Sequence, residues 1–159
     1  MIAKCLSCFV AMLLTASFGP GSGEEIRHLP SIVYGQILLG PGASRYETIF
    51  TVTSRKGVSA TLDLFTDRGE PMEASFVDSA GVVASTDSTF RFFLTANQPV
   101  RIKVQLPPDD MQEDVALKTG WANFRSSEEL DVWALVRILK PDGTLIDKHV
   151  LLSEKPPHS

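Results

Sequence analysis

The sequence predicts an all-β protein, an antiparallel β-sandwich of about eight or nine strands that follows a cleaved N-terminal signal peptide. Three observations support this fold class. From residue 24 onward the chain divides into runs of about five to ten residues separated by Gly, Pro, Asp and Ser, which is the spacing of strands in sandwiches and barrels. Several runs alternate apolar and polar residues with a period of two. None shows the 3.6-residue period of an amphipathic helix.

The first 23 residues have the features of an export signal. Lys4 supplies a positive charge, Cys5 to Leu14 form a short apolar segment, and Gly21-Ser22-Gly23 supply the small residues that signal peptidase requires. The apolar segment is shorter than the roughly 18 to 20 residues that a membrane anchor needs. No cysteine lies at the expected cleavage site, where a lipoprotein would need one. We therefore expect cleavage after Gly23, a mature chain with no membrane span, and a secreted or periplasmic location.

Composition restricts the function of the mature chain. Both cysteines lie in the predicted signal, so we expect no disulfide, thiol chemistry or thiolate metal site in the remainder. The 19 acidic residues outnumber the 15 basic ones, whereas a nucleic-acid-binding protein needs a clustered basic surface. A domain of about 150 residues buries enough surface to be stable without disulfides. We expect one domain over residues 24–152 and a flexible tail over residues 153–159.

Five strands are expected in the first half of this domain. The first covers Leu29 to Tyr34, and the next two, at 45–52 and 58–64, alternate between an apolar and a polar face. Shorter apolar runs at 72–77 and 89–95 complete the set. The breaks at 55–57, 67–71 and 78–81 place Gly where a tight turn needs a positive φ, so successive strands should be antiparallel neighbours.

Four strands are expected in the second half. Residues 100–106 show the clearest alternation, with four aliphatic side chains on one face and Arg101, Lys103 and Gln105 on the other. Further strands are expected at 118–125, 131–140 and 144–152, the last two joined by the turn Pro141-Asp142-Gly143. The tail contains two consecutive prolines, which cannot donate to a ladder, and is therefore not expected to extend a sheet.

The expected strand at 131–140 is apolar on both faces. One face carries Val132, Ala134, Val136 and Ile138, and the other carries Trp133, Leu135 and Leu139. A strand of this kind is covered on both sides, either by a loop of the same chain or by another protein. We favour the loop, and keep Trp133, Leu135 and Leu139 as the candidate contact surface.

No pattern of residues indicates catalysis or a cofactor. The histidines His28, His149 and His158 have no nucleophile at a recognised spacing, and His149 is expected to face solvent beside Asp147. The acidic segment 107–114 lacks the spacing and the Gly of a calcium loop, so we interpret it as a solvated loop. We predict a non-enzymatic protein with no catalytic, metal-binding or cofactor-binding residue.

The two tryptophans have two interpretations each. Exposed Trp side chains stack on sugar rings in carbohydrate-binding sandwiches, but large aromatic side chains also pack in sandwich cores. Trp121, between Gly120 and Ala122, has the close-packed setting of a core residue. For Trp133 both interpretations stay open.

Residues 29–152 resemble the stand-alone form of an immunoglobulin-like β-sandwich module found in exported bacterial proteins. The resemblance rests on Leu29-Pro30, the Thr-rich strand 47–54, the turn at 64–71, and Thr119-Gly120-Trp121-Ala122 leading into 132–135. The Cys…Trp…Cys signature of antibody domains is absent. The resemblance implies the fold but no reaction or ligand.

From these observations we expect a non-catalytic exported module that acts by contact with a protein partner or with the cell envelope. The contact would use one face of a sheet or an unpaired edge. The alternative is carbohydrate binding through exposed aromatic side chains. Neither expectation includes a nucleic-acid partner.

Overall fold

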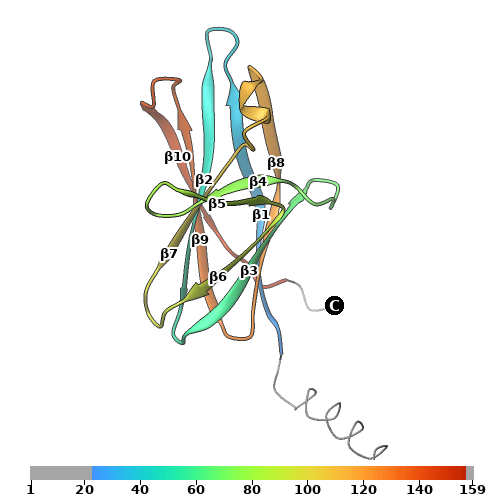
Figure 1. The fold of residues 1–159 in the computed structure, drawn as a ribbon, viewed down its shortest axis with the longest axis vertical. Coiled ribbons are helices and arrows are strands. Elements are labelled where there is room, and N and C mark those ends of the chain that lie inside the picture. Colours follow the sequence, from blue (N-terminus) through green and yellow to red (C-terminus); the bar gives the residue numbers. More distant parts are fainter. Residues whose placement is uncertain (1–22, 157–159) are drawn as a thin grey trace, which may run out of the picture.

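A computed structural model describes residues 23–156 of the protein (Figure 1). All but one of its elements are β-strands; the exception is a short 3₁₀ turn, η1, at Asp110–Gln112. The strands are β1 (Glu25–Ile37), β2 (Ser44–Ser54), β3 (Val58–Thr66), β4 (Ala74–Val77), β5 (Val83–Asp87), β6 (Thr89–Leu94), β7 (Val100–Gln105), β8 (Val115–Ser126), β9 (Leu130–Leu139) and β10 (Leu145–Leu152).

The ten strands form one antiparallel sheet that is nearly closed into a barrel. Eight of them follow the order β5-β4-β7-β2-β1-β8-β3-β6, and β9 and β10 extend from β2. In Figure 1, β4 and β5 run across the long axis of the molecule, whereas β2, β8 and β9 run close to it. This change of direction is the result of the strong curl of the sheet around its interior.

Strand β2 is the branching point of the sheet. One edge of β2 pairs with β9 over its whole length, and the other edge pairs first with β1 and then with β7. Gly35 lies in β1 at this point, with β2 on one side and β8 on the other. Its φ of 129° is disfavoured for other residues, and a Cβ there would lie 2.0 Å from the carbonyl oxygen of Ala116 in β8. The buried Thr48 hydroxyl donates to the Val33 carbonyl oxygen over 2.6 Å and reinforces the junction.

The inward side chains of the sheet make one continuous apolar core. Its largest members include Tyr34, Phe50, Phe76 and Phe124, none of which has exposed surface. The rings of Phe50 and Phe124 meet edge to face with centroids 5.2 Å apart, a favourable geometry for aromatic pairs. Alternation along each strand therefore supplies the core, as the period of two predicts.

The all-β class predicted from the sequence is confirmed, while the number of strands and some of the expected neighbours differ. Successive strands are antiparallel neighbours at β1–β2, β4–β5 and β9–β10, whereas β2 does not pair with β3, nor β3 with β4. All nine expected strands are present, and β5 is the additional strand. It was missed because none of its five side chains is buried, so its sequence carries no apolar alternation. Its segment is held against β4 by ladder pairing and by a 2.8 Å hydrogen bond between Ser75 and Thr86.

The C-terminal end of the chain differs from the predicted flexible tail. The predicted tail at 153–159 begins with paired residues, because the Glu154 and His28 backbones exchange two hydrogen bonds of 2.8 Å. The prolines that led us to expect a loose tail start only at Pro156, so they do not prevent this bridge. Apart from Gly23, the predicted signal peptide at 1–23 lies outside the described residues. Within residues 23–156 no helix has the length and apolar character to cross a membrane.

Candidate contact surface

Strand β9 has two apolar faces, as predicted, and they differ in burial. Val132, Ala134 and Val136 point into the core and are at most 6 % exposed. Trp133 and Leu135 alternate with them on the outer face of the sheet and are half-buried. Because both side chains keep exposed surface, the covering loop that we favoured does not seal this face.

Neighbouring strands extend the apolar surface on either side of β9. Residues that pair across a ladder lie on the same face of a sheet, so the register identifies the outward neighbours of Trp133 and Leu135. Trp133 lies between Thr51 of β2 and Leu152 of β10, and Leu135 lies between Ile49 and Val150 of the same two strands. We call this surface the β9–β10 face: it comprises Ile49, Thr51, Trp133, Leu135, Val150 and Leu152.

Charged side chains border the β9–β10 face, and most of them are basic. Arg101 and Lys103 of β7 pair with Thr51 and Ile49, and a third row contains Glu47, Arg137 and Lys148. Four basic groups thus accompany a single carboxylate.

Glu47 is the centre of an ion network in this border. Its carboxylate contacts the Arg137 guanidinium at 2.5 Å and the Lys103 ammonium at 3.7 Å. The rows beyond add one charge of each sign, Arg45 and Asp131. The border is therefore net positive on a protein of net charge −4.

Strand β10 is the outer margin of this surface. Within residues 23–156 it pairs with β9 alone, and Val150 and Leu152 are 61 % and 72 % exposed. The Pro141-Asp142-Gly143 turn joins the two strands, with hydrogen bonds from Lys140 to Thr144 of 2.8 Å and from Gly143 back to Lys140 of 2.9 Å. A register shift between Leu145 and Asp147 marks a β-bulge near its start.

The structure brings together two of the three predicted contact residues. Trp133 and Leu135 are adjacent on the outer face, whereas Leu139 is only 9 % exposed and offers almost no surface to a partner. Sequence reasoning missed Ile49, Val150 and Leu152. The apolar residues at 150 and 152 alternate with Leu151 and could have indicated a second strand with two apolar faces, but their proximity to Trp133 depends on register.

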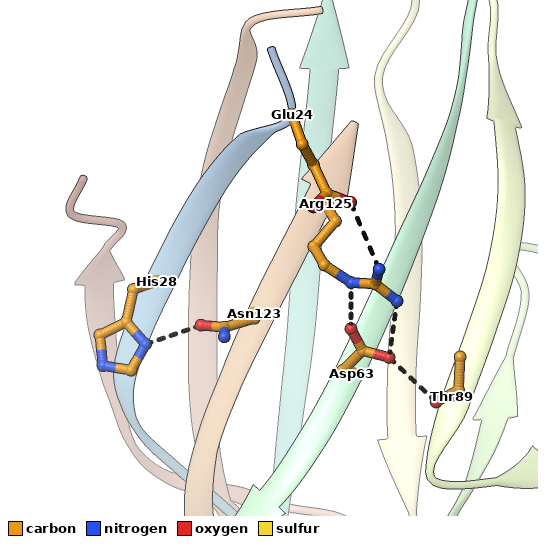
Figure 2. Close-up of polar contacts among 6 residues, drawn as sticks. All are labelled: Glu24, His28, Asp63, Thr89, Asn123 and Arg125. Atoms are coloured by element: carbon orange, nitrogen blue, oxygen red, sulfur yellow. Dashed lines mark hydrogen bonds and ion pairs between the residues drawn. The ribbon is translucent and has the colours of Figure 1, made fainter. Parts of the chain in front are cut away.

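The strands β1, β8, β3 and β6, which are consecutive neighbours in the sheet, carry a row of polar side chains on their outer face (Figure 2). The Arg125 guanidinium donates to Asp63 over 2.6 Å and to Glu24 over 3.3 Å, and Thr89 donates to Asp63 over 2.9 Å. The hydrogen bond to Asp63 raises the pKa of Arg125 above its ordinary value. The figure also shows His28 beside Asn123, with 2.9 Å between Nδ1 and Oδ1. These side chains, from four strands and the residue before β1, hydrogen-bond with one another.

Trp121 lies on the same outer face, and its indole is packed rather than open. The Phe65 ring stacks on it with centroids 4.2 Å apart, and the His28 ring approaches to 5.3 Å. The role predicted for Trp121 was packing in the core; the residue does pack, but outside the core. Its stacked face is occupied by Phe65 and is not available to a sugar ring.

The other candidates from the sequence also have definite places. His149 is exposed, with its Nε2 atom 3.2 Å from Asp147. The acidic loop contains η1, is held by the Gln36 side-chain amide through the Met111 and Glu113 carbonyls, and pairs Asp110 with Lys118 at 3.0 Å. In the described part of the chain, no three His, Cys, Asp or Glu side chains are arranged to hold a metal ion.

An open cavity of about 740 Å³ lies at one end of the molecule, beside the β2–β3 and β8–β9 turns. Its charged lining contains both signs. Arg27 pairs with Glu129 at 3.0 Å, and Lys56 pairs with Glu128 at 3.2 Å. Because these pairs neutralise each other, the cavity presents no surplus charge for a ligand of either sign.

Comparisons of the chain with protein-family models, with curated proteins and with solved structures found no match.

Proposed function

We propose that this protein is an exported, non-catalytic module with an immunoglobulin-like sandwich arrangement, which acts by binding a protein or the cell envelope through the β9–β10 face. The immunoglobulin-like arrangement is a narrower class than the all-β fold, and the β9–β10 face is the proposed binding surface. It includes export by residues 1–23 and a periplasmic or secreted location.

The observation that supports this function is the cluster of outward apolar side chains on β9 and β10. Trp133 and Leu135 are only half-buried, and Val150 and Leu152 are largely exposed beside them. A contiguous apolar surface of this kind, with charged residues around it, is typical of interaction sites. Trp is also among the residues that contribute most to binding energy at interfaces.

Two matched substitutions test the proposal. Val150 on the β9–β10 face and Phe93 on β6 are 61 % and 64 % exposed, and both lie on edge strands. The purified chain, immobilised, is exposed to an envelope extract of the producing cells. Val150→Asp should abolish the retention of a partner, while Phe93→Asp should preserve it. Equal retention by the two variants would refute the assignment of this face.

Carbohydrate binding is a second candidate because of Trp133. Unlike Trp121, Trp133 has no aromatic side chain stacked on it within the described residues. Exposed Trp rings bind sugars by stacking. Acrylamide quenching of Trp fluorescence, with and without a panel of polysaccharides, distinguishes the candidates: protection in wild type that disappears in Trp133→Ala favours carbohydrate, and no protection by any polysaccharide discards it.

A further inference from the structure

We propose that the free edge of β10 accepts an extended segment of a partner protein as an added strand, and that this segment carries an acidic side chain opposite Lys148 and apolar side chains opposite Val150 and Leu152. This inference rests on the proposed function and specifies the chemistry of the partner. Three features of β10 support it: its length as an edge, the alternation of its outward side chains, and the charge around it.

Strand β10 is the longest of the three described strands that pair on one side only. The strand has eight residues, compared with five in β5 and six in β6, the other two strands that pair on one side only. An edge strand presents backbone N–H and C=O groups without a ladder partner, and these can bind another strand. In β10 the Lys148 amide also donates to Asp147 Oδ1 over 2.8 Å. In strand addition these groups provide affinity, and alternate side chains provide specificity.

The outward side chains of β10 specify what such a strand should carry. Lys148, Val150 and Leu152 pair with Arg137, Leu135 and Trp133 of β9, and so lie on the β9–β10 face. An added strand would place every second side chain beside them, at cross-strand distance. Apolar side chains at two positions would extend the apolar surface, and an acidic one would meet Lys148 and the net positive border.

A second copy of this chain does not fit the edge as well. In two β10 strands paired about a two-fold axis, each side chain stays on its own face, so the axis must lie beside one residue and its copy. Axes at Lys148 and at His149 give the longest overlaps, seven of the eight residues of β10. With the axis at Lys148, two ammonium groups face each other; with the axis at His149, each Lys148 faces Val150 of the second copy. Both of these arrangements also join two positive borders, and like-charge contacts oppose association. Edge lysines are a common protection against self-pairing.

The experiment uses the full chain and synthetic peptides with one Glu and two Val at alternate positions and Thr between them, made in both sequence orders. Hydrogen exchange of the Leu145–Leu152 amides reports strand addition directly. The peptide should protect these amides, and a peptide with Pro beside the Glu should not. Lys148→Glu should weaken binding roughly 2- to 30-fold, the factor expected when one cross-strand charge pair is reversed. The same peptide with Lys in place of Glu should bind this variant better than wild type.

Arg91→Glu is the matched control, because Arg91 is an exposed basic residue of the edge strand β6. It should leave peptide binding unchanged. The proposal is overturned if no peptide protects β10, or if the Glu and Lys peptides bind wild type equally. It is also overturned if the β10 amides are protected in a concentration-dependent dimer, or if anionic phospholipid vesicles bury Trp133 while the peptides do not bind.

The two proposals fail in different ways. If Val150→Asp loses the envelope partner but no peptide protects β10, the contact face stands and strand addition is wrong. If Val150→Asp retains the partner, the contact face itself is wrong.

Discussion

Gly120 shows how a single residue decides whether three strands of this protein can pair. It lies on β8 between Ile32 of β1 and Thr66 of β3. A Cβ at this position would lie 1.9 Å from the Phe65 carbonyl oxygen and 3.1 Å from Met72 Cε. The first of these contacts is with backbone, which cannot rotate away as a side chain can.

We expect Gly120→Ala to lower the free energy of unfolding by about 1–3 kcal/mol, the usual effect of forcing extra atoms into a packed site. Gly42→Ala is the control, because no atom lies within 4 Å of the position that its Cβ would take; it should change stability by less than about 0.5 kcal/mol. Urea unfolding of the three proteins measures both values. A Gly120→Ala variant as stable as the control would show that β3 can move away.

Tyr34 is a buried titratable residue with a defined partner. Its side chain has no exposed surface, and its hydroxyl donates to the Glu73 carbonyl oxygen over 2.7 Å. Burial, assisted by the negative charges of Asp110 and Glu73, raises the pKa of Tyr34 above its ordinary value. The neutral phenol is therefore favoured in the folded state.

The stability of the protein should fall as the pH rises above about 10, where tyrosine in the unfolded chain loses its proton and Tyr34 in the folded chain does not. Tyr34→Phe should remove this part of the pH dependence and cost about 1 kcal/mol at neutral pH for the lost hydrogen bond. The Glu73 carbonyl keeps a donor in that variant, the Lys118 ammonium at 3.2 Å. Urea unfolding from pH 7 to 11 gives the comparison; parallel curves for the two proteins would contradict the assignment.

At the scale of elements, β9 is the strand whose two faces have different tasks. Its inward side chains complete the core, and its outward side chains form the middle of the β9–β10 face. Adjacent residues of one strand should consequently respond in opposite ways to the same substitution.

Val136→Asp should prevent folding or cost roughly 3 kcal/mol or more, because Val136 is 6 % exposed and a charge there would be buried without a partner. Leu135→Asp should leave the fold intact with a loss of about 1–2 kcal/mol, since Leu135 is half-buried and points outward. Circular dichroism and thermal unfolding distinguish the two. Collapse of both variants would remove Leu135 from the contact surface.

The molecule as a whole is a curled sheet whose last gap is partly bridged by its C-terminal segment. After β10 the chain leaves β9 and reaches β1, where Glu154 and His28 exchange their two backbone hydrogen bonds. Arg27 and Glu129 form an ion pair of 3.0 Å nearby. The first contact joins β1 to the segment after β10, and the second joins β1 to the β8–β9 turn.

A chain ending at Ser153 should therefore lose about 1–3 kcal/mol of stability relative to one ending at Lys155, at about 0.5–1.5 kcal/mol for each hydrogen bond lost. The His28 amide should also exchange faster with solvent in the shorter chain. Hydrogen exchange and urea unfolding of the two chains provide the measurements. Unchanged exchange at His28 would mean that the bridge contributes little to closure.

The strands could be predicted wherever one face is buried and the other faces solvent. Residues 100–106 and 58–64 alternate clearly, and the structure places β7 at 100–105 and β3 at 58–66. Alternation was absent in β5, which buries no side chain, and this strand was missed. The site was predicted in part for the same reason, because Trp133 and Leu135 are apolar residues on the face of the strand where polar ones are expected. Leu139 has the same position in the pattern but is buried.

The all-β class and the inward face of most strands can be predicted from the local sequence, because the period of two is a property of any extended backbone. The pairing partners cannot: β2 pairs with three strands and β9 lies between β2 and β10, an arrangement that brings Ile49, Val150 and Leu152 to Trp133 and Leu135. Ladder hydrogen bonds join backbone groups, which are nearly the same in every residue. The choice of neighbouring strand therefore depends on how the whole chain fills its core, and no short stretch of sequence encodes it.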